Sequence, residues 1–423
     1  MWADRRFRWW FLAQSFSASG GATQVVGLSW VLLARADAGV ALSLLTAAIF
    51  GPVLLGSLYG GTLVDRFDRR RVLLVTQGGF AVISAALAAC SAFGHLPSAV
   101  VYGAALATGA LNALDGPARQ VYLTDLVSPS RLPTALSLYE VIINGSRVFG
   151  PAAAGLLLSS AGLTACFAFT AVVFLPALTV LMTCHRVPDG SRCSAPGEAC
   201  VAPLTSAAPG STGPGLSTWR GALAHPGVLA CLLLAVATGV VTNVNVTLIP
   251  LLATRTLGQG STAYGLLAAS FGVGALLGAL ASIANRRPRP RLVVGLALGC
   301  GLTAALTAAG ASRLAVLGAG LALVALTAIW FVAQANALAQ LLAPPGARGR
   351  VMGLWNMALP GLNPLTALGA GALADRYNPP TALAASGVAI TVLAIAAAPG
   401  LARYPPTHDD QHPSTGHPGA TPP

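Results

Sequence analysis

The feature that most limits the fold of this chain is a series of long apolar runs, each bounded by charged, polar or proline-rich clusters. An α-helix needs about 20 consecutive apolar residues to cross a bilayer core about 30 Å thick. Short alternating segments, typical of a transmembrane β-barrel, do not dominate. The sequence therefore predicts an all-α polytopic membrane protein with 12 transmembrane helices. The twelve runs lie at 9–34, 43–64, 72–94, 97–118, 133–159, 162–184, 226–252, 263–284, 292–311, 314–342, 351–374 and 380–402.

The arginines indicate how such a chain lies in the membrane. All 24 basic residues are Arg, and 19 of them fall in the two termini or in loops that follow even-numbered spans. Cytoplasmic loops carry an excess of basic residues, so we expect both termini in the cytoplasm of a cell inner or plasma membrane. The net charge of +12 then reflects topology and not a nucleic-acid partner. Arg147 lies inside a span, and four arginines lie on the other side: Arg35, Arg255, Arg313 and Arg376.

A polar segment divides the spans six and six. Residues 185–222 are rich in Pro, Gly, Ser and Ala, which is typical of a cytoplasmic linker. We expect one six-helix bundle at 1–184 and a second at 223–403, related by duplication around a central cavity. The first span has no small-residue cleavage site, which predicts a retained helix and not a signal peptide. The Pro-rich tail 404–423 is expected to be disordered, and its histidines to hold no metal.

The segment 60–74, GGTLVDRFDRRRVLL, resembles the loop between helices 2 and 3 of the major facilitator superfamily. Other segments resemble its branch of enterobactin, drug and siderophore exporters, namely NALDGPARQVYLTDLV at 112–127, RGRVMGLW at 348–355 and LADRY at 373–377. The resemblance implies the fold of that superfamily, two pseudo-symmetric six-helix bundles. Asp68 stands where the family commonly has glycine. The loop pattern is carried by Gly61, Leu63, Asp65, Arg66, Arg69 and Arg70.

The resemblance also implies a conformational latch on the cytoplasmic side. In the family the loop aspartate caps the N-terminus of helix 11 and pairs with a motif arginine and an acidic residue of helix 4. The corresponding groups here are Asp65, the backbone at 349–352, Arg69 and Asp115. The alternative is that these charges only retain the loop in the cytoplasm, but the glycines before Asp65 favour the latch. We assign to it Gly61, Asp65, Arg66, Arg69, Arg70, Asp115 and Arg119.

The fifth span contains the candidate energy-coupling residues. Glu140 and Arg147 are seven residues apart and share a helix face with Asn144. Because charges at mid-bilayer are costly, such residues usually face a bundle interior and have a function. Desolvation raises a carboxyl pKa and a nearby cation lowers it, so Glu140 is a candidate proton carrier or substrate counter-ion. A static Glu140–Arg147 pair that stabilises packing is the alternative.

Gly150, Pro151 and Gly155 of the same span resemble the Gly-Pro motif found in antiporters of this superfamily, with Ala154 replacing one glycine. The arginine and asparagine before them complete an NxxRxxGP pattern. Small residues allow close helix packing, and proline bends a helix. The motif favours export over import.

Polar residues inside spans are candidates for a substrate cavity, with interhelical hydrogen bonding as the alternative role. Trp330 and Trp355 are candidate aromatic walls. The cavity candidates are Gln14, Ser17, Gln24, Asn112, Tyr139, Asn144, Asn243, Asn245, Gln334, Asn336, Asn356 and Asn363.

Together these patterns predict a secondary active transporter. A chain without Lys has no GxxxxGK[ST] nucleotide loop, and no catalytic cluster is visible in the spans, so we expect neither an enzyme nor a cofactor. The expected partners are the lipid bilayer and a small organic substrate such as a drug, antibiotic or siderophore. We expect a monomer that exports this substrate against a proton gradient by alternating access. An importer or facilitator of the same fold, or a transporter-like receptor, are the alternatives.

Overall fold

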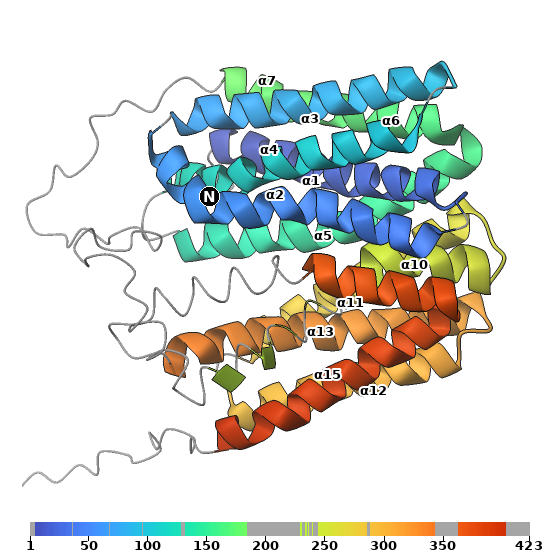
Figure 1. Cartoon of the computed structure of the whole chain (residues 1–423). Helices are drawn as coiled ribbons and strands as arrows, with labels where there is room; N and C mark the ends of the chain where they lie inside the picture. The colour runs from blue at the N-terminus through green and yellow to red at the C-terminus, as the bar shows by residue number, and fades with distance from the viewer. Residues whose placement is uncertain are drawn as a thin grey trace, which may run out of the picture.

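The computed structural model describes most of the apolar runs and shows a helical protein (Figure 1). All regular structure within the described ranges is helical. Side chains 55–66 and those of Glu140, Asn144 and Asn245 are outside this description, as are the linker 185–222 and the tail 404–423. The described ranges are 5–35, 37–66, 68–94, 96–127, 132–183, 244–285, 288–342 and 363–402, with isolated residues between 229 and 239.

The first half of the chain forms one group of helices. Two of them, α6 and α7, follow each other with a break at Phe174, and together cover the sixth predicted span. The helices of this first group are α1 (Arg5–Leu32), α2 (Ala38–Arg66), α3 (Arg69–Ala92), α4 (Ser98–Leu126), α5 (Leu132–Ser160), α6 (Gly162–Val173) and α7 (Leu175–Thr183).

The second half forms a second group. Its first described helix contains wide π-helical turns on both sides of a short α-helical piece, a distortion that is frequent at functional positions. The elements of this second group are η2 (Val244–Leu248), α10 (Ile249–Leu251), η3 (Leu252–Thr256), α11 (Ser261–Ala284), α12 (Pro290–Ala309), α13 (Leu314–Leu342), a helix over 363–376, and α15 (Pro379–Ala402).

Seven helical stretches among the described residues are long and apolar enough to cross a membrane. The helices α1 and α4, predicted as spans, have 28 and 29 residues but are more polar. Their polar side chains contact one another inside the first group, as described below. The seven stretches are Arg69–Ala92, Val141–Ser160, Gly162–Thr183, Ser261–Ala284, Pro290–Ala309, Leu314–Ala339 and Pro379–Leu401.

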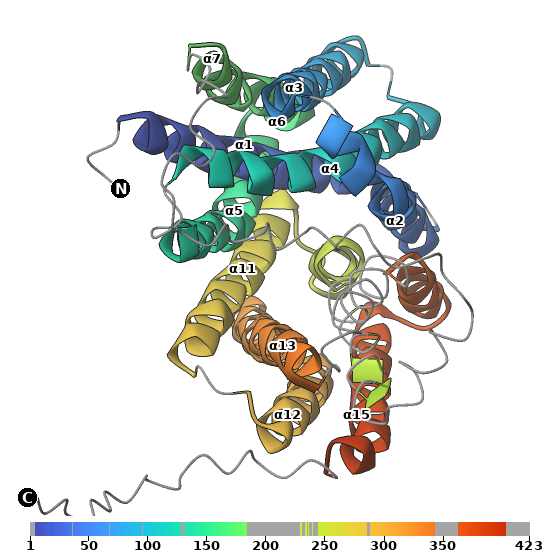
Figure 2. The same ribbon diagram turned by 90° about the vertical axis from the view of Figure 1, so that its left-hand side faces the viewer.

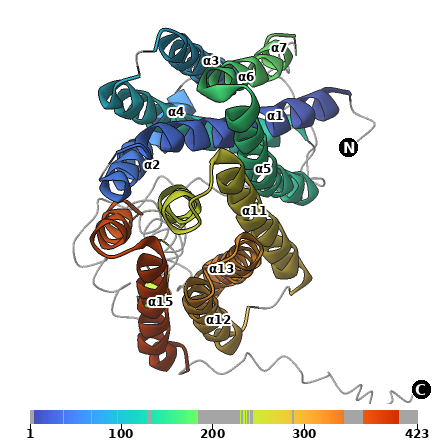
Figure 3. The ribbon, with the colours of Figure 1, turned by 90° about the vertical axis from the view of Figure 1, so that its right-hand side faces the viewer.

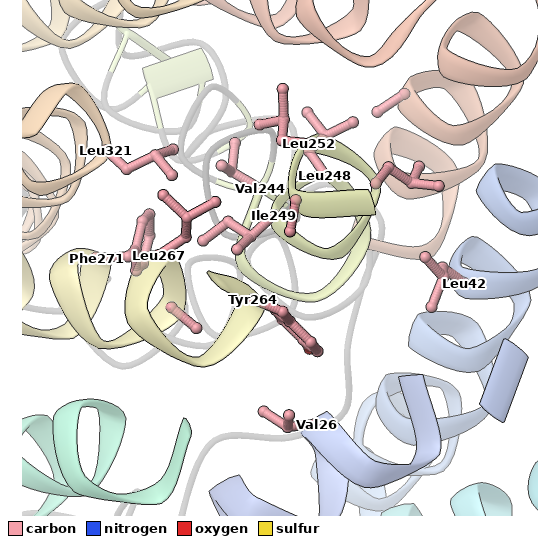
Figure 4. Close-up of a cluster of buried hydrophobic side chains, with 14 of the residues drawn as sticks. Val26, Leu42, Val244, Leu248, Ile249, Leu252, Tyr264, Leu267, Phe271 and Leu321 are labelled. Carbon is pink, nitrogen blue, oxygen red and sulfur yellow. The ribbon is translucent and has the colours of Figure 1, made fainter. Parts of the chain in front are cut away.

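The two groups meet along α5 and α11, and along α2 and the helix at 363–376 (Figures 2 and 3). We call the end of the molecule where α1 begins the amino-terminal face, and the other end the opposite face. One apolar cluster continues across the boundary, as Val26 and Leu42 lie in it with Leu248, Ile249 and Tyr264 (Figure 4). The groups are therefore joined by a shared core.

Candidate functional site

A buried ion pair lies within the first group between α1, α3 and α4. Asp115 and Arg119, four residues apart on α4, are 3% and 6% exposed and form a salt bridge. Thr76 Oγ1 and Gln77 Nε2 of α3 donate to Asp115 Oδ1 at 2.7 and 2.9 Å. Burial of a charge is costly unless it is paired and hydrogen-bonded, and these partners meet that requirement.

The α1 helix completes this polar network. Ser17 Oγ donates to Gln77 Oε1 at 2.7 Å and accepts from Arg119 Nη2 at 3.2 Å. Nearer the opposite face, Gln24 Nε2 donates to Thr108 and Gln24 Oε1 accepts from Ser84, both at 3.2 Å. Ser17 and Gln24, predicted as cavity residues, thus bond to other helices of their own group.

Two Trp/Gln pairs contain buried polar atoms without a hydrogen-bond partner. The segments WFLAQ, which begins at Trp10, and WFVAQ, which begins at Trp330, place a Trp and a Gln one helical turn apart on α1 and α13. The indole Nε1 of each Trp and the amide Oε1 of Gln14 and Gln334 are buried and have no hydrogen-bond partner. Gln334 Nε2 donates to the backbone oxygen of Asn285 at 2.9 Å. Since unpaired buried polar groups are rare, these four atoms are candidate contacts for a ligand or water.

Aromatic rings surround the Trp10 pair. Trp10 stacks on Tyr139 of α5, with ring centroids 6.3 Å apart, and lies against Tyr122 of α4 at 6.5 Å. Phe7 packs beside it at 6.4 Å. Tyr139, a predicted cavity residue, therefore lies against Trp10 in an aromatic cluster near the amino-terminal face.

The α5 motif residues lie where α5 packs against its neighbours. A Cβ on Gly155 would lie 2.7 Å from the Cα of Gly265 of α11, and one on Gly265 would lie 2.9 Å from the Pro151 carbonyl oxygen. A Cβ on Gly150 would lie 2.8 Å from the Ser19 carbonyl oxygen of α1. These glycines therefore permit direct backbone contact, and the α5–α11 contact joins the two groups.

Arg147 is half-buried on α5, and its backbone carbonyl faces Gly272 of α11. Arg147 has an interaction within the protein. The side chains of its predicted partners Glu140 and Asn144 are outside the described residues.

Two charged residues at the start of α3 make contacts that explain their presence. Asp68 is the N-cap of α3 and accepts from Arg70 N at 3.0 Å, which explains an acidic residue where the family commonly has glycine. The Arg70 guanidinium donates to the carbonyl oxygens of Leu181 and Met182 at 2.6 and 2.8 Å, at the end of α7. A cation at a helix C-terminus is stabilising, so Arg70 ties α3 to α7 within the first group.

The rest of the predicted latch is only partly described. Arg69 has an interaction within the protein, and Asp115 pairs with Arg119 on its own helix. Gly61 lies on α2, but the side chains of Asp65 and Arg66, and the backbone at 349–352, lie outside the described residues.

The remaining cavity candidates differ in their surroundings. Asn112 is exposed on α4, Asn336 is half-buried on α13, and Asn363 is buried. The last two have interactions within the protein. Asn243, Asn356 and Trp355, and the side chain of Asn245, are outside the described residues.

One contact at the opposite face was not assigned any role from the sequence. Asp375, at the end of the helix 363–376, accepts from Gly39 N and Val40 N of α2 at 2.9 Å each. It also accepts from Arg255 Nη1 of η3 at 2.6 Å. The segment LADRY contains this aspartate, and its similarity to LVDRF before α3 was the available signal.

Two groups of apolar helices, a shared core and buried charges inside the span region define a polytopic helical membrane protein. A model of the family described as "Transmembrane secretion effector" matches residues 2–421, so the chain belongs to that family. Solved structures agree on the fold. A bacterial homologue of the lysosomal transporter Spinster has a TM-score of 0.65 at 16% identity, covering 94% of this chain and 96% of that one. A POT family transporter has a TM-score of 0.71 at 10% identity, with the same coverage.

Curated relatives are transport proteins. The chain is 30% identical to the staphyloferrin A transporter of Staphylococcus aureus over 40% of this chain and 44% of that one. It is 31% identical to the multidrug efflux pump Tap of Mycobacterium tuberculosis over 38% and 40%. For the tetracenomycin C resistance and export protein of Streptomyces glaucescens the identity is 33% over 28% and 21%. The aligned stretches span less than half the length of these relatives.

Proposed function

We propose that this protein exports a small organic molecule, such as a drug, antibiotic or siderophore, across the cell membrane in exchange for protons. The observation that carries the proposal is the family membership of nearly the whole chain, joined to relatives described as efflux or export proteins. In this proposal the chain has twelve spans in two six-helix bundles that alternate around a central cavity, as in other transporters of this fold.

The arrangement of arginines supports an orientation with the amino-terminal face in the cytoplasm. The positive-inside tendency places the arginine-rich loops there, together with Arg70 and Arg71 in the first turn of α3. The opposite face would then be extracellular or periplasmic. In this orientation the Trp10/Gln14 and Trp330/Gln334 pairs lie in the cytoplasmic halves of α1 and α13.

In this proposal, Glu140 on α5 couples transport to the proton gradient. Glu140 is one of two glutamates in the chain and the only one inside a predicted span, one turn before Asn144 and two before Arg147. An intramembrane carboxyl beside a cation can gain and lose a proton during the cycle. A potential of 100 mV supplies about 2.3 kcal/mol for each charge that crosses, enough for one proton to support a sizeable gradient of a neutral substrate.

Substrate contact is assigned to the buried amide oxygens of Gln14 and Gln334, with Asn112 as an exposed amide on α4. Unlike Ser17 and Gln24, these two glutamines keep an acceptor without a partner in the described structure. One lies in each helix group, as expected if both bundles hold the substrate. The nearby rings of Trp10 and Tyr139 would contact its apolar part.

The proposal is tested in inside-out membrane vesicles with an acidic lumen. The probes are staphyloferrin A and tetracenomycin C, taken from the names of the relatives, and the dye ethidium. We expect at least one probe to accumulate in the vesicle lumen, the accumulation to stop when a protonophore is added, and Glu140→Gln to abolish the proton-dependent part.

Glu198→Gln is the matched control, because Glu198 is the other glutamate and lies in the predicted linker. It should transport like the parent. Equal proton-dependent rates for the parent and Glu140→Gln would show that the coupling role of Glu140 is wrong.

A further inference from the structure

A seven-residue pattern occurs twice in this chain. Residues 61–67 are GTLVDRF and residues 371–377 are GALADRY, so both copies follow Gly-x-Leu-x-Asp-Arg-aromatic. The first copy is at the end of α2, and the second is at the end of the helix 363–376. Because these helices end at different faces, the copies lie at the two ends of the molecule (Figure 1). Only the second copy has its aspartate side chain described.

The aspartate of the second copy joins the two helix groups. Its two carboxylate oxygens accept from Gly39 N and Val40 N, each at 2.9 Å. These amides belong to the first turn of α2, where backbone N–H groups have no partner within the helix. The carboxylate also meets the favourable end of the α2 dipole. Asp375 thus acts as a helix cap supplied by the other group.

Arg255 makes the position favourable for a carboxylate. Asp375 is at the C-terminal end of its own helix, where a negative charge is unfavourable. Arg255 Nη1 approaches Asp375 Oδ1 at 2.6 Å, and the side chains are 30% and 18% exposed. Arg255 itself lies in the π-helical turn η3.

The backbones approach closely beside this carboxylate. A Cβ on Gly371 would overlap the Gly39 carbonyl oxygen, and a Cβ on Gly39 would overlap that of Gly371. One turn further, Ser43 Oγ donates to the Ala367 carbonyl oxygen at 2.6 Å. Both the glycine and the aspartate of the second copy therefore take part in the contact between α2 and the helix 363–376.

We infer that Asp375 is the gating residue of the opposite face. In this conformation its contacts with Gly39, Val40 and Arg255, which we name the opposite-face clasp, hold α2 against the second group. The carrier must break the clasp whenever it opens to that face. The second copy of the pattern would then close the opposite face, as the first copy is predicted from the sequence to close the amino-terminal face. The inference rests on alternating access in the proposed function, and not on export or on proton coupling.

The test measures access to the buried interface without any substrate or gradient. Thr46 lies fully buried on α2, and its Oγ1 is 3.4 Å from that of Thr247. In a chain whose seven cysteines are replaced, Thr46→Cys is labelled with a membrane-impermeant maleimide added at the opposite face. Charge-assisted hydrogen bonds are the strong ones, so we expect Asp375→Asn to speed labelling about tenfold or more. Arg255→Gln should act in the same direction.

Arg313→Gln is the matched control. Arg313 is an exposed arginine in the turn between α12 and α13, at the same face, and is not part of the clasp. Its labelling rate should equal that of the parent. If Asp375→Asn does not fold, Arg255→Gln decides the question. Folded clasp variants that are labelled at the parent rate would overturn the inference, whether or not the protein transports any probe.

Discussion

At the scale of single residues, the buried charges are the part of the site with the best defined chemistry. Asp115 was expected to contribute to a latch with the loop before α3. The structure pairs it with Arg119 and gives it two hydrogen bonds from Thr76 and Gln77 of α3. The i,i+4 spacing of the ion pair is visible in the sequence, but the bonds to α3 and α1 depend on how three helices are rotated. Periodicity alone does not specify this.

Removal of one partner from this pair should destabilise the protein. Asp115→Asn leaves the Arg119 charge buried without a counter-ion, so we expect a loss of about 3–5 kcal/mol of stability. Thermal unfolding in detergent, followed by tryptophan fluorescence, should show a clearly lower melting temperature. The double variant Asp115→Asn/Arg119→Gln removes both charges and should recover part of that loss.

The control for this prediction is Arg313→Gln, which removes an exposed arginine and should change stability by less than about 0.5 kcal/mol. A melting temperature of Asp115→Asn equal to that of the parent would contradict the assigned role. A double variant less stable than the single variant would also contradict it.

At the scale of elements, the apolar runs predicted the positions of the described helices well. The run at 162–184 corresponds to α6 and α7, and the run at 263–284 to α11. The π-helical turns around α10 were not predicted, because they arise from packing and not from the hydrophobic pattern. The Gly-Pro motif of α5 was recognised from the sequence, but its partner Gly265 was not, since contacts between distant helices have no local signal.

The α5–α11 contact can be tested with two glycines of the same helix. Gly155→Ala would place a methyl group 2.7 Å from the Cα of Gly265. The backbones must move apart, and such overpacking typically costs about 1–3 kcal/mol. We expect a lower melting temperature for this variant.

Gly145→Ala is the comparison, because a Cβ on Gly145 has no atom within 4 Å. Since alanine favours helix over glycine by about 1 kcal/mol, this variant should be as stable as the parent or more stable. If Gly155→Ala unfolds at the same temperature as Gly145→Ala, the close approach at the α5–α11 contact is not significant for stability.

At the scale of the whole molecule, the structure contains contacts between the groups at the opposite face. The shared apolar cluster and the opposite-face clasp lie there. The sequence predicted two bundles from the linker and the spacing of spans. It did not predict which halves of the helices would touch, because that depends on the conformation adopted in the cycle. The clasp and the proposed coupling residue Glu140 lie on different elements, so opening of the face and proton transfer can be examined separately.

The most direct test of the account is the direction in which a proton gradient drives the substrate. Inside-out vesicles that contain the parent protein are prepared with an acidic lumen, and then with an alkaline lumen, and uptake of the same transported probe is followed. Proton-coupled export predicts accumulation in the acidic lumen only, with loss of accumulation when a protonophore is added. Accumulation driven by an alkaline lumen would indicate import with protons, and uptake that is independent of the gradient would indicate facilitation; either result would contradict the account.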